Sequence, residues 1–168
     1  MNNTMTGYTH LLRQADIFFQ FPPEHLERVA GFCQERTYST GEVIFPEGSR
    51  SDELYIIAHG EVEILVNPAL VSDQPAQEFH PVHIATLRQG QSFGEIALVD
   101  QGLRSATARA AQSPTRVLIL YKTQLISLCE ADQSFGYRLM YNLAADLALK
   151  IRSTDLMIRE ELLYAAKK

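Results

Sequence analysis

Residues 90–110 read GQSFGEIALVDQGLRSATARA, and this stretch decides how the rest of the chain is interpreted. It lies in a region whose pattern is otherwise typical of β-strands, yet the residues that follow Gly94 can form one turn of helix. The first N–H groups of a helix have no partner within it, and the helix dipole favours negative charge there. Gly94 also lets the backbone approach a ligand closely. The stretch therefore predicts an anion-binding site.

Two side chains of opposite charge, Glu95 and Arg104, stand nine residues apart in this stretch, and Ser105 follows the arginine. A guanidinium can hold phosphate oxygens through two parallel hydrogen bonds, which an ammonium cannot do. A carboxylate can accept a hydrogen bond from a ribose hydroxyl, but it repels a phosphate. One acid and one base in the same pocket therefore favour a ligand that carries both a sugar and a phosphate.

The order Phe-Gly-Glu-Ile-Ala-Leu at 93–98, followed by Arg-Ser-Ala-Thr at 104–107, resembles the phosphate-binding cassette of the cyclic-nucleotide-binding domain family. That family includes the catabolite activator protein, kinase regulatory subunits and cyclic-nucleotide-gated channels. Residues 41–65, GEVIFPEGSRSDELYIIAHGEVEIL, resemble its earlier strands. The resemblance implies a mainly β fold with helices: a β-roll (a double-stranded β-helix or jelly roll) flanked by N-terminal helices and a long C-terminal helix.

The resemblance also implies roles for individual residues of the cassette, residues 93–107. Glu95 would bind the ribose 2′-hydroxyl, and Arg104 would pair with the cyclic phosphate. The backbone N–H groups of Ile96 and Ala97, with the hydroxyl or amide of Ser105, would complete the phosphate site. The implied site residues are Gly94, Glu95, Ile96, Ala97, Arg104 and Ser105.

We expect such a chain to bind its ligand without catalysis. The ligand would be cyclic AMP or cyclic GMP. Cyclic AMP is favoured, although a hydroxyl such as that of Ser105 can favour guanine in the kinase branch of the family. No metal and no further cofactor are expected. The chain would act as a regulatory sensor, in which the nucleotide shifts the long C-terminal helix between two positions.

The rest of the chain is consistent with this organisation. Residues 9–34 predict two short helices broken at Phe21-Pro22-Pro23, since proline stops one helix and suits the first turn of the next. Short strands with turn signals between them run from about residue 38 to 121. Residues 67–81 are a polar, proline-bearing loop, interpreted as a long hairpin tip. We divide the chain into a β-roll domain with N-terminal helices, residues 9–133, and a long helix, residues 134–168.

The long helix carries an apolar stripe with steps of four or seven residues. Its part beyond about Arg152 is expected to overhang the roll, so the stripe predicts a homodimer seam. Base contacts are sought on this helix near residues 138–142, without an assignment. The stripe consists of Leu143, Leu147, Ile151, Ile158 and Leu162.

Composition limits the other classes of function. The net charge is −5, and no basic stripe typical of a nucleic-acid binder is present. The chain ends at Lys168 with no room for a helix-turn-helix, so DNA binding by this chain is not expected. No apolar run reaches the ~20 residues of a membrane span, and no signal peptide is visible. The widely spaced Cys33 and Cys129 fit reduced thiols in a cytoplasmic protein. An effector protein or a missing effector domain would receive the signal.

Two other functions remain open at this level. In a ligand-free, degenerate roll, Glu95 and Arg104 would form an internal salt bridge, and the chain would serve as a protein-interaction module. In a cupin-like metalloenzyme, His80 and His83 would bind a metal, although the histidine and glutamate spacing of that class is incomplete here.

Overall fold

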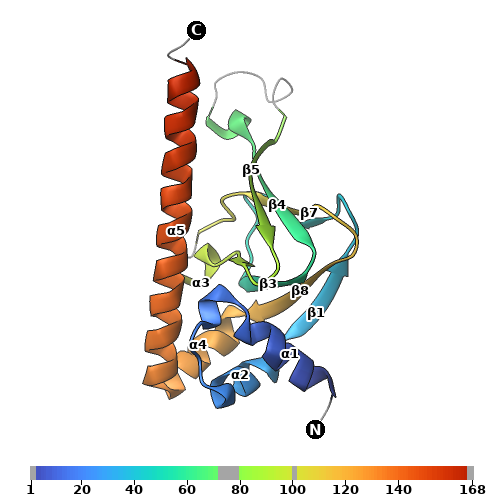
Figure 1. Cartoon of the computed structure of the whole chain (residues 1–168), viewed down its shortest axis with the longest axis vertical. Coiled ribbons are helices and arrows are strands. Elements are labelled where there is room, and N and C mark those ends of the chain that lie inside the picture. Colours follow the sequence, from blue (N-terminus) through green and yellow to red (C-terminus); the bar gives the residue numbers. More distant parts are fainter. Residues whose placement is uncertain (1–2, 72–79, 100–101, 166–168) are drawn as a thin grey trace.

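Two four-stranded antiparallel sheets form a β-roll, with the helices at one end and along one side (Figure 1). The computed structural model describes residues 3–71, 80–99 and 102–165. One sheet has the strand order β1-β8-β3-β6 and the other β2-β7-β4-β5. The strands are β1 (Gln34–Tyr38), β2 (Val43–Phe45), β3 (Glu53–His59), β4 (Glu61–Val66), β5 (Val82–Arg88), β6 (Ser92–Phe93), β7 (Thr107–Ala110) and β8 (Thr115–Tyr121).

The helices account for the rest of the described architecture. Pro23 begins its helix at a position where a missing N–H costs nothing, as the sequence predicted. The longest helix, α5, follows Asp132, whose carboxylate accepts hydrogen bonds from the N–H groups of Ser134 and Phe135. The helical elements are α1 (Asn3–Arg13), η1 (Asp16–Phe18), α2 (Pro23–Ala30), η2 (Pro68–Val71), α3 (Ile96–Val99), α4 (Lys122–Ala131) and α5 (Gln133–Ala165).

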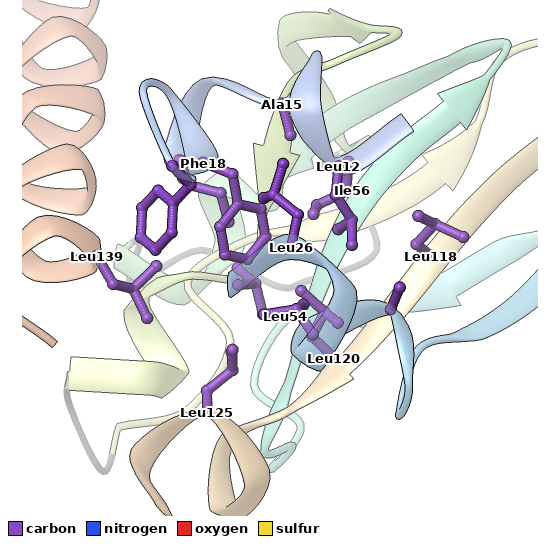
Figure 2. Close-up of a cluster of buried hydrophobic side chains, with 14 of the residues drawn as sticks. Leu12, Ala15, Phe18, Leu26, Leu54, Ile56, Leu118, Leu120, Leu125 and Leu139 are labelled. Atoms are coloured by element: carbon purple, nitrogen blue, oxygen red, sulfur yellow. The ribbon is translucent and has the colours of Figure 1, made fainter. Parts of the chain in front are cut away.

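Strand β3 separates two hydrophobic clusters because its side chains alternate between its faces. Leu54 and Ile56 point to a cluster shared with the helices, while Tyr55 and Ile57 point into the roll. Figure 2 shows the first cluster, where side chains from the N-terminal helices, β3, β8, α4 and α5 meet. This cluster fixes the start of α5 against the roll, because Leu139 belongs to it.

The fold class predicted from the sequence is confirmed. The first strand begins at Gln34, earlier than the predicted residue 38. The sequence did not indicate this start because the first four residues of the strand are exposed and show no apolar alternation. The predicted hairpin tip begins with η2, and residues 72–79 of it lie outside the described residues.

The part of α5 beyond about Arg152 is exposed at every described residue, as an overhanging segment would be, and the homodimer seam stays a prediction. The helix runs beside the roll (Figure 1), and Ile158 and Leu162 line a cavity together with Val66 and Val82 of the roll. Of the predicted stripe, Leu143 is buried in the helical cluster, and the later members face this cavity. The helix lies alongside because the core at its start sets its direction.

Candidate functional site

Arg104 is the central charged group of the cassette, and only 5% of it is exposed. Its Nη1 donates to the carbonyl oxygen of Gly94 at 2.9 Å. Its Nη2 donates to Ser51 Oγ at 2.6 Å and to the carbonyl oxygen of Glu53 at 2.7 Å. The guanidinium carbon lies 4.1 Å from the centre of the Phe45 ring, a cation–π distance. Burial lowers the pKa of Arg104 from its ordinary value. These contacts fix the direction of the guanidinium.

Hydrogen bonds among three neighbouring side chains hold the acceptors of the Arg104 guanidinium in place. Ser51 Oγ donates to Glu53 Oε2 at 3.1 Å, and the Tyr55 hydroxyl donates to the same oxygen. Burial, together with this hydrogen bond, raises the pKa of Tyr55. Sequence reasoning missed Ser51 and Glu53. They lie about fifty residues before Arg104 and reach it through the pairing of β3 with β6 and through backbone hydrogen bonds of Arg104 with Gly48 and Ser49.

One donor of the Arg104 guanidinium differs from the others. Arg104 Nε is buried, and it has no acceptor among the described residues. A buried donor without an acceptor costs ~1–3 kcal/mol, and more when it is charged. The surroundings of the guanidinium therefore suit an anion, which would accept a hydrogen bond from Arg104 Nε–H.

Gly94 is required by the close approach of the arginine. Its φ is +79°, a conformation that side chains rarely adopt, and a Cβ there would meet Arg104 Nη1 inside contact distance. The glycine that the sequence singled out for close backbone approach thus makes room for the guanidinium.

Glu95 is the second buried charge of the cassette, with 6% of it exposed. Its Oε1 lies 3.1 Å from Lys150 Nζ of α5. The same ammonium donates to the carbonyl oxygen of Ser92 at 2.9 Å and to Asp146 Oδ2 at 2.7 Å. Sequence reasoning missed Lys150. Its only signal is the spacing of four residues from Asp146, which is common on exposed helix faces.

Glu95 and Arg104 each have other partners in the described structure and form no salt bridge with each other. The internal salt bridge of a degenerate pocket is therefore not what the structure shows. Both side chains instead line one cavity.

That cavity has a volume of about 1160 Å³ and lies between the cassette, the sheet of β4 and β5, and α5. It is large enough for a nucleotide. Of the six implied site residues, the side chain of Ala97 lies outside the described part of the structure. The others line the cavity: Gly94, Glu95, Ile96, Arg104 and Ser105.

The segment sought for base contacts, residues 138–142, lies elsewhere. Asn142 donates to the carbonyl oxygens of Ile17 and Phe19, at 3.0 Å each, and so ties α5 to η1. Residues between Asp146 and Leu162 line the cavity instead. Residues 138–142 are not among the residues that line the cavity, because the start of α5 packs in the helical cluster, and base contacts from α5 stay a prediction.

The described residues hold no group of three or more His, Cys, Asp or Glu side chains placed to bind a metal. His83 Nε2 instead lies 2.9 Å from Thr86 Oγ1. Among the helices in the described ranges, none is both long and apolar enough to cross a membrane.

The fold is a β-roll, and one cavity beside it is lined by the buried Glu95 and the buried Arg104. Residues 35–132 match the family model described as the cyclic nucleotide-binding domain, and the chain belongs to this family. It is 29% identical over 145 residues to the cyclic AMP receptor protein of Thermus thermophilus, covering 86% of this chain and 61% of that protein. It is 26% identical over 113 residues to human cGMP-dependent protein kinase 2, covering 67% of this chain and 14% of the kinase.

Known structures share the architecture. The crystal structure of the Thermus thermophilus catabolite activator protein superposes with a TM-score of 0.70 at 29% identity, over 89% of this chain and 63% of that one. A cyclic nucleotide-binding domain from Methylobacillus flagellatus gives a TM-score of 0.74 at 22% identity, over 93% of this chain and 83% of that one, and supports the fold alone. The chain thus spans less than two thirds of the full-length relatives it matches first.

Proposed function

We propose that the chain binds a cyclic nucleotide, with cyclic AMP favoured over cyclic GMP, as a regulatory sensor module that performs no catalysis. The observation that carries the proposal is the buried Arg104, whose Nε–H lacks an acceptor in the described residues, in the same cavity as the buried Glu95. An anion and a hydroxyl-bearing sugar are the two ligand groups that these side chains suit. The similarity to the cyclic AMP receptor protein supports the choice of base.

In this proposal Arg104 pairs with the cyclic phosphate, and Glu95 accepts the ribose 2′-hydroxyl. Ser105 and the backbone N–H groups of Ile96 and Ala97 complete the phosphate contacts. Part of the free energy of binding would shift α5, which lines one side of the cavity, between two positions. The proposal divides the chain into the β-roll domain with its N-terminal helices, residues 9–133, and the long helix, residues 134–168.

Calorimetric titration with cyclic AMP, cyclic GMP and the 2′-deoxy form of cyclic AMP tests the function. Arg104→Ala should weaken cyclic AMP binding by ~2–4 kcal/mol, because a charge-assisted partner in a buried site is lost. Arg116→Ala is the matched control: it removes an arginine from an exposed ion pair with Glu35. A folded Arg104→Ala variant with unchanged affinity would refute the assignment, and absence of nucleotide binding by the unaltered protein would leave the interaction-module alternative.

Glu95→Gln tests the sugar contact. The unaltered protein should prefer cyclic AMP to its 2′-deoxy form, since only the ribose offers the hydroxyl that the carboxylate accepts. The variant should bind cyclic AMP more weakly and lose most of that preference. Equal binding of both ligands by the unaltered protein would show that Glu95 does not read the sugar.

We also propose a homodimer that pairs through α5. The later residues of the predicted seam, Ile151, Ile158 and Leu162, line the cavity but are exposed. A second row, Leu149, Leu156 and Leu163, is also exposed and repeats at seven-residue steps. Such a repeat suits a helix pair. Leu156→Asp with Leu163→Asp should give monomers in sedimentation, and an unaltered protein that is monomeric at high micromolar concentration would contradict the dimer.

Location and signalling partner belong to the same proposal. We place the protein in the cytoplasm, which its two free cysteines support. The signal would pass to an effector protein or an effector domain.

A further inference from the structure

Lys150 connects three parts of the site at once. Its ammonium has three donors, and it meets three acceptors: Glu95 in the cassette, the carbonyl oxygen of Ser92 in β6, and Asp146 on its own helix. Glu95 and Asp146 are both largely buried carboxylates. The lysine is therefore held in one place rather than extended into solvent.

The partner of Glu95 fixes how the carboxylate can meet a ligand. Within the described residues, only Oε1 of Glu95 has a charged partner, and this is Lys150. A carboxylate has two oxygens, so Oε2 can accept a further hydrogen bond while Oε1 stays on the ammonium. Without that ammonium, the carboxylate would be free to turn.

The charge of Lys150 also matters for an anionic ligand. Glu95 and Asp146 place two carboxylates against this one ammonium. A third carboxyl group, Asp16, lines the same cavity, and burial followed by the charge of Asp146 raises its pKa. A cyclic phosphate entering the cavity meets this negative charge. Lys150 offsets it close to the sugar contact.

Lys150 is also the last firm connection of α5 to the roll. Every described residue of α5 after Lys150 is exposed, and the Ser153 and Thr154 hydroxyls donate to carbonyl oxygens of their own helix. The ion pair between Lys150 and Glu95 therefore connects the cassette to the point where the exposed part of α5 begins.

We infer that Lys150 is the positioning residue of the sugar contact: it holds Glu95 through Oε1, leaves Oε2 for the ribose hydroxyl, and ties α5 to the cassette. The inference rests on the proposed function. It assigns sugar discrimination to a residue of the long helix as well as to the cassette.

The test is the ratio of two affinities measured by calorimetry on the full chain, for cyclic AMP and for its 2′-deoxy form. Lys150→Gln removes the ammonium and should weaken cyclic AMP binding about tenfold or more, with a smaller loss for the 2′-deoxy ligand, which does not use Glu95. The preference for ribose should therefore fall. Lys150→Arg keeps the charge and should restore much of the preference.

Arg152→Gln is the matched control, because it removes one positive charge from an exposed position of the same helix. It should leave the ratio of affinities unchanged. Leu139 and Leu143 hold α5 in the core, so Lys150→Gln should fold. Circular dichroism checks this, and Lys150→Met replaces it if it does not fold.

The outcomes separate the two proposals. If the unaltered protein binds no cyclic nucleotide, the proposed function fails. If it binds and prefers ribose, but a folded Lys150→Gln keeps that preference, only the role of Lys150 is overturned. Tighter binding of cyclic AMP by Lys150→Gln would mean that the lysine competes with the sugar, and this would also overturn it.

Discussion

Gly94→Ala is the substitution that best tests how the Arg104 guanidinium is positioned. The residue has a φ of +79°, and an added Cβ would meet Arg104 Nη1 inside contact distance and the carbonyl oxygen of Glu53 at 3.1 Å. The backbone of Glu53 belongs to strand β3 and cannot easily move. The guanidinium of Arg104 must therefore move away from residue 94.

Two costs add in this variant. A positive φ at a residue with a side chain costs ~1–2 kcal/mol. Displacing the guanidinium breaks at least its 2.9 Å hydrogen bond to the Gly94 carbonyl oxygen, and hydrogen bonds of charged groups contribute ~1.5–3 kcal/mol each. The free energy of unfolding should fall by roughly 2.5–5 kcal/mol, the sum of these two costs.

Comparison with Gly41→Ala isolates the second cost, the displacement of the guanidinium. Gly41 has a φ of +84°, but nothing lies within 4 Å of its would-be Cβ, so this variant has the backbone strain without the clash. Urea denaturation should show Gly94→Ala less stable than Gly41→Ala by about 1.5–3 kcal/mol. Calorimetry should show weaker nucleotide binding in Gly94→Ala alone. Equal stability of the two variants, with normal binding in both, would refute the reasoning.

Three further expectations concern the rest of the molecule. Leu143→Ala should lower the free energy of unfolding by ~2–5 kcal/mol, because Leu143 is 1% exposed, whereas Phe19→Ala, at 63% exposed, should change it by about 0.5 kcal/mol or less in urea denaturation. The hydroxyl of Ser134 and the N–H of Phe135 lower the pKa of Asp132 to about 2, so its charge stabilises the fold at neutral pH. Asp132→Asn should lower the Tm there, with a difference that shrinks as the pH falls from about 4 towards 2, and a difference independent of pH would contradict this. Cys33 is half-buried, and burial raises its pKa to about 12, so maleimide at pH 8 should label it slowly until the chain unfolds. Labelling of the folded protein as fast as that of the unfolded chain would contradict the raised pKa.

The cassette could be interpreted from the sequence because its parts are close along the chain. Gly94, Glu95 and Arg104 fall within one short segment, and their residue types alone indicate an anion and a sugar. The strands and helices could be predicted for a similar reason, since alternation, proline and glycine act over a few residues. β1 was the exception, because its exposed polar residues give no alternation.

The direction of α5 could not be obtained in this way. An apolar stripe shows which face of a helix is buried, but not what covers it. The sequence assigned that face to a second chain. The structure buries Leu143 in the helical cluster and places Leu147 and Ile158 at the cavity, with Ile158 52% exposed, and pairing with a second chain stays a prediction.

The sequence by itself determined the family, the β-roll and the charged pair Glu95 and Arg104, because each depends on local order along the chain. Only the tertiary structure decided what holds that pair. Ser51 reaches Arg104 across 53 residues of sequence, and Lys150 reaches the Ser92 carbonyl oxygen across 58. Such contacts depend on strand pairing and on the packing of α5 against the core, and no local pattern of residues encodes them.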